Sequence, residues 1–207
     1  MNWYDKIAYF YDLFSERIYA TARKELVDSI GLQKGDTVLL IACGTGLSFD
    51  VIEAKIQSDG LIIGIDNSKK MLEFAKQKIE KKGWRNIVLI HDDIRLLSPS
   101  LIRKYVGKNI EFDKVIGELA FSVVPDWEKV VDKSMELLKE DGKIGVLDGY
   151  RNQKDWLSRL LNFFPKSDVS RNISEYLGLV TKNYWGKKLG RTKILFIGIG
   201  NKKNNEQ

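Results

Sequence analysis

The chain has 207 residues, of which 43% are hydrophobic and 30% are charged, and its formal net charge is +6 at pH 7. This composition is ordinary for a soluble globular protein, and no apolar run reaches the roughly 18 residues that predict a membrane-spanning helix. The N-terminus lacks the pattern of a secretory signal, and Cys43 is the only cysteine, which excludes an internal disulfide. We therefore expect a cytoplasmic location. The lone His91 predicts no metal site.

The basic charge is concentrated in the last third of the chain. From residue 151 onward there are 12 Lys and Arg against 4 Asp and Glu, while the first 150 residues carry 22 against 24. A contact with an acidic partner and an ordinary solvated lysine-rich surface both fit this asymmetry.

Strands and helices alternate regularly along the chain as far as residue 150. The aromatic-rich first 35 residues are expected to form a helical segment that ends at Gly31. Short apolar runs predict strands at 38–42, 61–65, 87–90, 112–116 and 144–147, and segments of helical period predict helices at 47–56, 69–82 and 127–138. Strict alternation with nearly continuous apolar strands predicts a parallel sheet that is covered on both faces.

The last third departs from this alternation. Residues 179–188 and 193–199 are separated by a short gap that contains a glycine, which predicts an antiparallel hairpin at the edge of the sheet. The expected fold is therefore α/β, with a doubly wound, mostly parallel, seven-stranded sheet and a C-terminal antiparallel edge hairpin.

The first strand breaks directly into a glycine turn, Cys43-Gly44-Thr45-Gly46. Two glycines one residue apart let the backbone turn tightly and approach a ligand closely. A strand, a glycine turn and a following helix make a site for an anionic or polar ligand. Phe49 stands at the third position of the G-x-G-x-x-G pattern, and no G-x-x-x-x-G-K-[ST] loop exists, so we expect a ligand without a pyrophosphate.

Carboxylates stand where the following predicted strands end. In doubly wound sheets, ligands bind beyond these C-terminal ends. Asp66 ends the second strand and is able to accept hydrogen bonds from both hydroxyls of a ribose. Asp93, beside Asp92, ends the third strand and is able to accept a hydrogen bond from an exocyclic amine. The sequence therefore predicts a ligand that carries an adenosine-like group. Glu118, near the end of the fourth strand, is a candidate base or substrate contact.

These motifs resemble those of the class I S-adenosylmethionine-dependent methyltransferases. V-L-L-I-A-C-G-T-G resembles the first motif of the family, G-I-D-N-S-K-K-M-L the second, and I-V-L-I-H-D-D-I the third. F-D-K-V-I-G-E and L-L-K-E-D-G-K resemble the fourth and fifth. The opening W-Y-D-K-I-A-Y-F-Y-D resembles the start of the ubiquinone/menaquinone-biosynthesis C-methyltransferases and of related bacterial phospholipid N-methyltransferases.

The resemblance implies a Rossmann-like enzyme that uses S-adenosyl-L-methionine. By in-line displacement, it would transfer a methyl group to a small or amphiphilic acceptor, either quinone-precursor-like or lipid-like. No dedicated catalytic residue is implied, with Glu118 kept as a candidate. The implied cofactor contacts are Tyr11, Ala42, Cys43, Gly44, Thr45, Gly46, Asp66, Asn67, Met71, Asp93, Ile94, Gly117 and Glu118.

The same resemblance divides a single domain, residues 1–207, into functional parts. These parts are a helical cap at 1–35, a cofactor-binding core at 36–150, an acceptor lid at 151–178 and the edge hairpin at 179–200. The basic, aromatic-containing stretch 151–171 has an amphipathic face that would suit a lipid surface or an amphiphilic substrate. A helix packed on the sheet fits the same stretch.

Two residues depart from the first motif of the family. Leu40 stands where the family usually has an acid, and Ala42 stands where it usually has its first glycine. The missing acid keeps a second hypothesis open, a cofactor-binding protein without transferase activity. A nucleic-acid methyltransferase ranks third, because G-E-L-A-F-S replaces the N/D-P-P-Y/F signature after the fourth strand.

Overall fold

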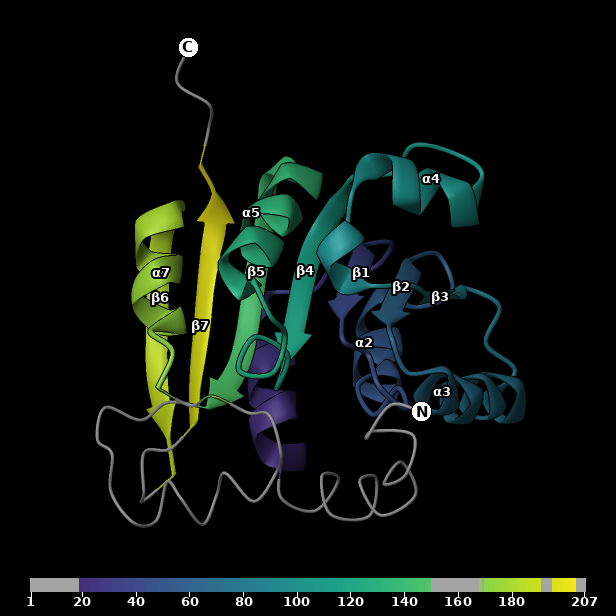
Figure 1. Cartoon of the computed structure of the whole chain (residues 1–207). Helices are drawn as coiled ribbons and strands as arrows, with labels where there is room; N and C mark the ends of the chain where they lie inside the picture. The colour runs from purple at the N-terminus through teal and green to yellow at the C-terminus, as the bar shows by residue number, and fades with distance from the viewer. Residues whose placement is uncertain (1–18, 150–167, 169, 191–194, 204–207) are drawn as a thin grey trace.

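The computed structural model describes residues 19–149, 168, 170–190 and 195–203, and its centre is a twisted sheet (Figure 1). The sheet has seven strands in the order β3-β2-β1-β4-β5-β7-β6. The first five strands along the chain pair in parallel, and β7 pairs antiparallel with both β5 and β6. The strands are β1 (Thr37–Ile41), β2 (Leu61–Asp66), β3 (Ile87–His91), β4 (Phe112–Glu118), β5 (Leu138–Gly149), β6 (Thr181–Leu189) and β7 (Leu195–Lys202).

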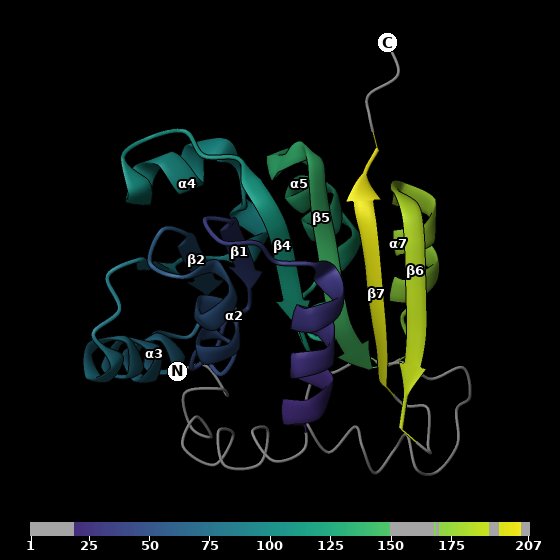
Figure 2. The same cartoon turned by 180° about the vertical axis from the view of Figure 1, so that it is seen from behind.

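Helices cover both faces of this sheet. Seen from behind, the helix at residues 19–30 lies over the sheet together with α2 (Phe49–Ile56) and α3 (Lys69–Lys82) (Figure 2). The opposite face carries α4 (Pro99–Val106), α5 (Trp127–Leu137) and α7 (Ile173–Val180), while Ile94–Leu96 forms a short 3-10 turn, η1 (Figure 1).

The alternation of side chains along β1 explains why there are two apolar cores. Leu40 packs in the cluster with Leu26 and other side chains of the helix at 19–30, whereas Leu39 and Ile41 pack in the cluster that α5 covers. Successive strand residues point to opposite faces, so a fully apolar strand must be buried on both sides. This is the covered parallel sheet that the sequence predicts.

The bounds of α3 agree with the predicted helix, because both of its ends carry strong local signals. The Ser68 hydroxyl accepts a hydrogen bond from the Met71 amide at 3.2 Å, and Gly83 ends the helix at φ +72°. Several predicted bounds are wrong, and the largest difference is in β5, which spans Leu138–Gly149 although the sequence predicts a strand only at 144–147. The first helix begins at Phe49 and not at Leu47, and residues 179 and 180 belong to α7, so the predicted strand begins at Thr181.

The C-terminal hairpin forms as predicted, with its second strand inserted into the sheet. β7 lies between β5 and β6, which makes β6 the edge strand. At the centre, the strand order reverses between β1 and β4, because β2 and β3 lie to one side of β1 and β4 and β5 to the other. This reversal is the switch point at which ligands bind in such sheets. Within the described ranges, no helix has the length and apolar character needed to cross a bilayer.

Candidate functional site

The glycine turn after β1 is built from residues in the left-handed backbone region. Ala42, Gly44 and Gly46 have φ angles of +52°, +56° and +72°. The Gly46 amide donates to the Cys43 carbonyl at 3.0 Å, which closes the turn. A Cβ built on Gly44 would meet no atom within 4 Å, so the turn has open space beside this residue. A ligand is thus able to approach the backbone there.

Gly46 has a different task, which is to make room for Phe49. A Cβ on Gly46 would lie 2.3 Å from the Phe49 ring, and Phe49 is fully buried with its ring edge-on to Trp84 at 6.4 Å between centroids. In this chain, an aromatic ring fills the space beneath the turn. The third glycine of a dinucleotide site, which allows close helix packing, therefore has no counterpart here.

Asp66 ties the end of β2 to the glycine turn. Its Oδ2 accepts a hydrogen bond from the Gly44 amide at 2.9 Å, and its Oδ1 accepts one from the Ser68 amide at 2.8 Å. The residue is only 7% exposed, and this burial raises the pKa of its carboxyl while the two amides act to lower it. A carboxylate offers about four acceptor positions, so Asp66 keeps capacity for a ligand hydroxyl.

Asp93 is engaged with Arg95 in the structure. Arg95 Nε lies 3.0 Å from each carboxylate oxygen of Asp93, and this contact holds the pKa of the carboxyl below its ordinary value. Asp93 also accepts from the Arg95 amide at the start of η1, where the neighbouring Ile94 is buried. Asp92 instead accepts from the Asp93 amide. The assignment of Asp93 and Ile94 to an adenine stays a prediction.

The remaining predicted contacts lie around the same strand ends. Cys43 Sγ packs so close to Gly64 that a Cβ there would lie 2.8 Å away, and burial raises the pKa of the thiol well above its ordinary value. Cys43 is thus a packed side chain and not a thiolate. Met71 is buried in the first turn of α3, whereas Asn67 is exposed beside Asp66. The predicted contact Tyr11 lies outside the described residues, as do residues 150–167 of the predicted lid.

Two further predicted contacts lie close to the switch point. Thr45 is buried inside the glycine turn. Gly117 precedes Glu118 in β4, and a Cβ on Gly117 would lie 2.5 Å from the Phe121 ring. A glycine at this position lets the segment after β4 fold back closely onto the strand.

Glu118 ends β4 beside the glycine turn and connects three parts of the chain. Its Oε2 accepts hydrogen bonds from Arg23 Nε at 2.8 Å and from Ser48 Oγ at 2.6 Å. The side chains of Arg23 and Glu118 are 8% and 12% exposed. The other oxygen, Oε1, is buried and has no hydrogen-bond partner among the described residues. An unpaired buried acceptor costs about 1–3 kcal/mol, so this atom marks a place for a ligand donor.

Asp148, near the end of β5, is a site residue that the sequence reasoning missed. It is fully buried, and its Oδ2 accepts from the amides of Phe121 and Ser122 at 2.8 and 3.1 Å. It therefore anchors the segment that follows β4. Burial raises the pKa of its carboxyl, and burial together with the Asp148 charge raises that of Tyr19. The signal was available, because an acid ends this strand as others end β2 and β3.

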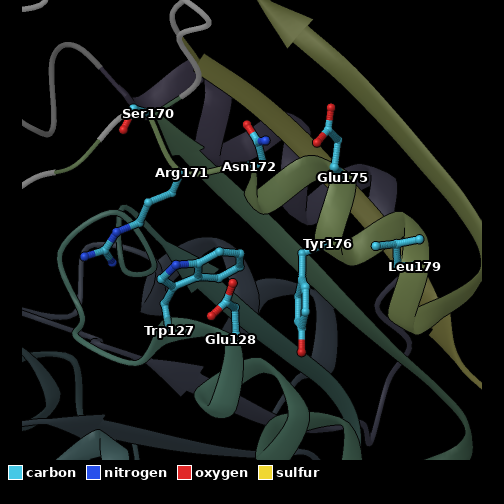
Figure 3. A pocket seen from close by; sticks show the side chains of 8 residues that line it. All are labelled: Trp127, Glu128, Ser170, Arg171, Asn172, Glu175, Tyr176 and Leu179. Carbon is cyan, nitrogen blue, oxygen red and sulfur yellow. The ribbon is translucent and has the colours of Figure 1, made fainter.

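A separate cavity of about 360 Å³ lies between α5 and α7 (Figure 3). Trp127 and Tyr176 project into it from these two helices, and no residue of the glycine turn lines it. Arg171, also at its wall, donates to the carbonyls of Phe121 and Val124 and so holds the segment after β4 from this side. The cavity lies apart from the strand-end site.

The strand-end residues fit an adenosine that carries an amino-acid tail. Three features lie at the ends of neighbouring strands. Asp66, at the end of β2, keeps acceptor capacity; open space lies beside Gly44, just after β1; and Glu118, at the end of β4, has an unpaired Oε1. Among the described residues, no group of three or more His, Cys, Asp or Glu side chains is arranged to hold a metal ion. This sheet order and this site define the class I S-adenosylmethionine-dependent methyltransferases.

Comparison with known proteins identifies the family. Residues 32–192 match the family model described as a methyltransferase domain, and the chain belongs to that family. It is 27% identical to the demethylmenaquinone methyltransferase of Oceanobacillus iheyensis over 96% of this chain and 83% of that protein. With the corresponding enzyme of Listeria welshimeri, it shares 27% identity over 70% of this chain and 60% of that protein.

Solved structures show the same fold at low sequence identity. A putative methyltransferase from Haloferax volcanii, solved with the Trm112 methyltransferase activator, aligns with a TM-score of 0.79 and 15% identity over 99% of both chains. The geranyl diphosphate C-methyltransferase of Streptomyces coelicolor A3(2), solved with S-adenosyl-L-homocysteine, aligns with a TM-score of 0.70 and 9% identity over 90% of this chain and 77% of that one. As a member of the methyltransferase family, this enzyme uses S-adenosylmethionine as its cofactor.

Proposed function

We propose that this methyltransferase acts on a small or amphiphilic acceptor of the quinone-precursor or lipid type. The observation that carries the proposal is the extent of the similarity to the Oceanobacillus iheyensis demethylmenaquinone methyltransferase. That similarity covers 96% of this chain, and so it reaches beyond the cofactor core into the C-terminal third. A likeness that reached only the cofactor motifs would say nothing about the acceptor.

The residues of the chain have mainly binding and positioning tasks in this proposal. The glycine turn, Asp66 and Asp93 would hold the cofactor, and Asp148 would keep the segment after β4 in place on the acceptor side. When bound, the cofactor supplies a methyl group on a positively charged sulfur, which is already a good leaving group. Alignment of the acceptor and exclusion of water are then able to supply most of the rate.

Proton transfer needs no dedicated side chain in this scheme. Glu118 has one oxygen engaged by Arg23 and Ser48, an arrangement suited to holding a charged ligand group in place. It would act as a base only for an acceptor that must lose a proton, provided that the proton lies within hydrogen-bond reach.

The test is a direct assay with the full-length protein. The protein is incubated with S-adenosylmethionine and, in separate reactions, with demethylmenaquinol or with vesicles that contain phosphatidylethanolamine. S-adenosylhomocysteine is quantified, and the acceptor is examined by mass spectrometry for one added methyl group. We expect methylation of the quinol. Methylation of the phospholipid alone would move the assignment to the lipid type.

Two other results would overturn the proposal. If an RNA preparation accepted methyl groups while both amphiphiles did not, the enzyme would be a nucleic-acid methyltransferase. If the protein bound S-adenosylhomocysteine in calorimetry but methylated neither amphiphile nor any component of a metabolite extract, it would be a cofactor-binding protein without transferase activity.

A further inference from the structure

We propose that Glu118 binds the ammonium group of the amino-acid end of the cofactor, and that Arg23 and Ser48 hold Glu118 in the orientation this requires. This inference rests on the S-adenosylmethionine cofactor and is independent of the acceptor. It gives a task to an arrangement for which the fold alone provides no reason, a buried carboxylate with one oxygen fully engaged and the other unpaired.

The unpaired oxygen is the first step of the argument. Glu118 Oε1 is buried and has no partner among the described residues, although the opposite oxygen accepts from both Arg23 Nε and Ser48 Oγ. A buried acceptor without a donor costs about 1–3 kcal/mol, so native proteins seldom leave one unpaired without a purpose. A donor that arrives with the ligand would recover this free energy on binding.

The second step is the position of Glu118 along the sheet. The strand order runs β3, β2, β1, β4, and the carboxylates assigned to the adenosine end β3 and β2. The part of the ligand that continues past the ribose therefore extends over the glycine turn toward β4. The end of β4 lies about 10 Å from that of β2, which is two strand spacings. The amino-acid end of the cofactor would lie in this direction, and its ammonium is a strong donor.

The third step comes from Ser48, which is used in an unusual way. Ser48 occupies the N-cap position of α2, where a serine side chain normally accepts from a backbone amide of the helix. Here it makes no such bond and donates to Glu118 Oε2 instead. Because Ser48 lies only two residues after Gly46, this bond fixes the carboxylate against the turn and away from Asp148, which faces the segment after β4.

Arg23 completes the arrangement from a distant part of the chain. It is 6% exposed, lies on the helix at 19–30, and pairs with Glu118 across 95 residues of sequence. The guanidinium compensates the charge of the buried carboxylate before the ligand arrives and holds the side chain aligned. Leu40 supplies no charge on this face: it pairs in register with Ile116, two residues before Glu118. On this face of the sheet, the acidic side chain is therefore Glu118 at the end of β4 and not a residue of β1.

The experiment compares ligands with and without the amino-acid end by isothermal titration calorimetry, on the full-length protein. S-adenosylhomocysteine carries the ammonium, its deaminated analogue lacks only that group, and 5′-methylthioadenosine lacks the whole amino-acid end. A hydrogen bond to a charged group contributes about 1.5–3 kcal/mol, so Glu118→Gln should weaken S-adenosylhomocysteine binding about 10- to 100-fold. Its affinity for 5′-methylthioadenosine should stay within about twofold of the wild type.

Two comparisons within the same series separate binding from a structural role. Wild-type protein should bind the deaminated analogue more weakly than S-adenosylhomocysteine by the same factor, and Glu118→Gln should bind both equally. Glu111→Gln, the same substitution at an exposed residue just before β4, is the matched control and should change neither affinity. Arg23→Met should lose S-adenosylhomocysteine affinity while it keeps 5′-methylthioadenosine affinity, and Arg23→Lys should recover part of the loss.

Several outcomes would overturn the inference. Equal affinity of Glu118→Gln and wild type for S-adenosylhomocysteine would exclude the contact. An equal loss for all three ligands would show that Glu118 only supports the fold. The comparison of the first two ligands on wild-type protein needs no variant, so equal affinities would overturn the inference even if Glu118→Gln does not fold, and the Arg23 variants would then test the assignment to Glu118. Failure of the wild type to bind any of the three would instead remove the cofactor assignment, a result distinct from those above.

Discussion

At the scale of single residues, Asp66 has a structural task beside the cofactor contact that we propose for it. It is the acceptor for the Gly44 and Ser68 amides, and so it shapes the glycine turn that it also faces. A ribose contact by Asp66 is thus inseparable from the shape of the turn. This explains why the residue is buried although a carboxylate pays a desolvation cost, which raises its pKa.

We expect Asp66→Ala to reduce both ligand affinity and stability. The loss of charge-assisted hydrogen bonds should weaken S-adenosylhomocysteine binding about tenfold or more, measured by calorimetry. The two amides left without an acceptor should lower the free energy of unfolding by about 2 kcal/mol, measured by urea denaturation. Asp50→Ala is the control, because Asp50 forms an exposed ion pair with Lys82 and should change stability by less than about 1 kcal/mol. Unchanged affinity in Asp66→Ala would contradict the cofactor site.

Ala42 adopts a backbone conformation that favours glycine. Its φ of +52° places its Cβ against the following carbonyl group, a strain that costs a non-glycine residue about 1–2 kcal/mol. We expect Ala42→Gly to raise the free energy of unfolding by about 1 kcal/mol after the greater entropy of an unfolded glycine is subtracted. Gly44→Ala tests the same strain in reverse. Because the new Cβ would meet no neighbouring atom, the strain alone should lower the free energy of unfolding by about 1 kcal/mol. Loss of stability in Ala42→Gly would show that the methyl group packs favourably enough to outweigh the strain.

At the scale of secondary-structure elements, Tyr176 gives α7 a specific contact with α5, in addition to the apolar core that both helices share. The Tyr176 ring packs edge-on against Trp127 with 5.2 Å between centroids, and its hydroxyl donates to Asp132 Oδ1 at 2.7 Å. Burial and the neighbouring Asp132 carboxylate raise the pKa of Tyr176 to about 12. Since α7 leads into the edge strand β6, this contact positions the helix that precedes the edge strand, while the strand ladders hold the C-terminal strands in the sheet.

We expect Tyr176 to ionise well above the ordinary range of a tyrosine. The difference between the ultraviolet pH titrations of wild type and Tyr176→Phe should show one phenol with a pKa of about 12, against about 10 for an ordinary tyrosine. Between these values the folded state keeps a proton that the unfolded chain has released, so stability falls as the pH rises through this interval. The slope over the same interval should be smaller in Tyr176→Phe, and the raised pKa values of Tyr19 and Tyr184 account for the part that remains. A difference titration centred near 10 would contradict the hydrogen bond to Asp132.

Local signals in the sequence account for the elements that were predicted well. The bounds of α3 follow from a capping serine and a terminal glycine that lie next to it. The insertion of β7 between β5 and β6 has no such signal, because strand order depends on pairing between segments that are distant in sequence. The Arg23–Glu118 pair, which spans 95 residues, was beyond reach for the same reason. Asp148 was within reach, because it ends an apolar strand in the same manner as Asp66.

At the scale of the whole molecule, the last third of the chain is rich in basic residues and contributes the two strands at one end of the sheet. The last third of the chain carries 12 basic and 4 acidic residues, and β6, the edge strand, belongs to it. Trp185 is 45% exposed on this strand, and Lys187, two residues further along, lies on the same side of it and pairs with Glu25. An aromatic ring beside basic charge suits the surface of an anionic membrane, from which an amphiphilic acceptor would be drawn.

We expect the full-length protein to co-sediment with vesicles that contain anionic phospholipid at low ionic strength, and to be released near 1 M salt, where the Debye length is about 3 Å. Each lysine near such a surface contributes about 1 kcal/mol, so Lys187→Gln should reduce the partition coefficient about fivefold. Lys76→Gln, the same change at an exposed lysine of α3 near the opposite edge strand, is the matched control and should leave it unchanged. Equal losses in the two variants would show that binding to the vesicles depends on the net charge of the protein and not on the position of Lys187. Absence of co-sedimentation at low salt would leave a lipid acceptor without support and favour one that reaches the site from solution.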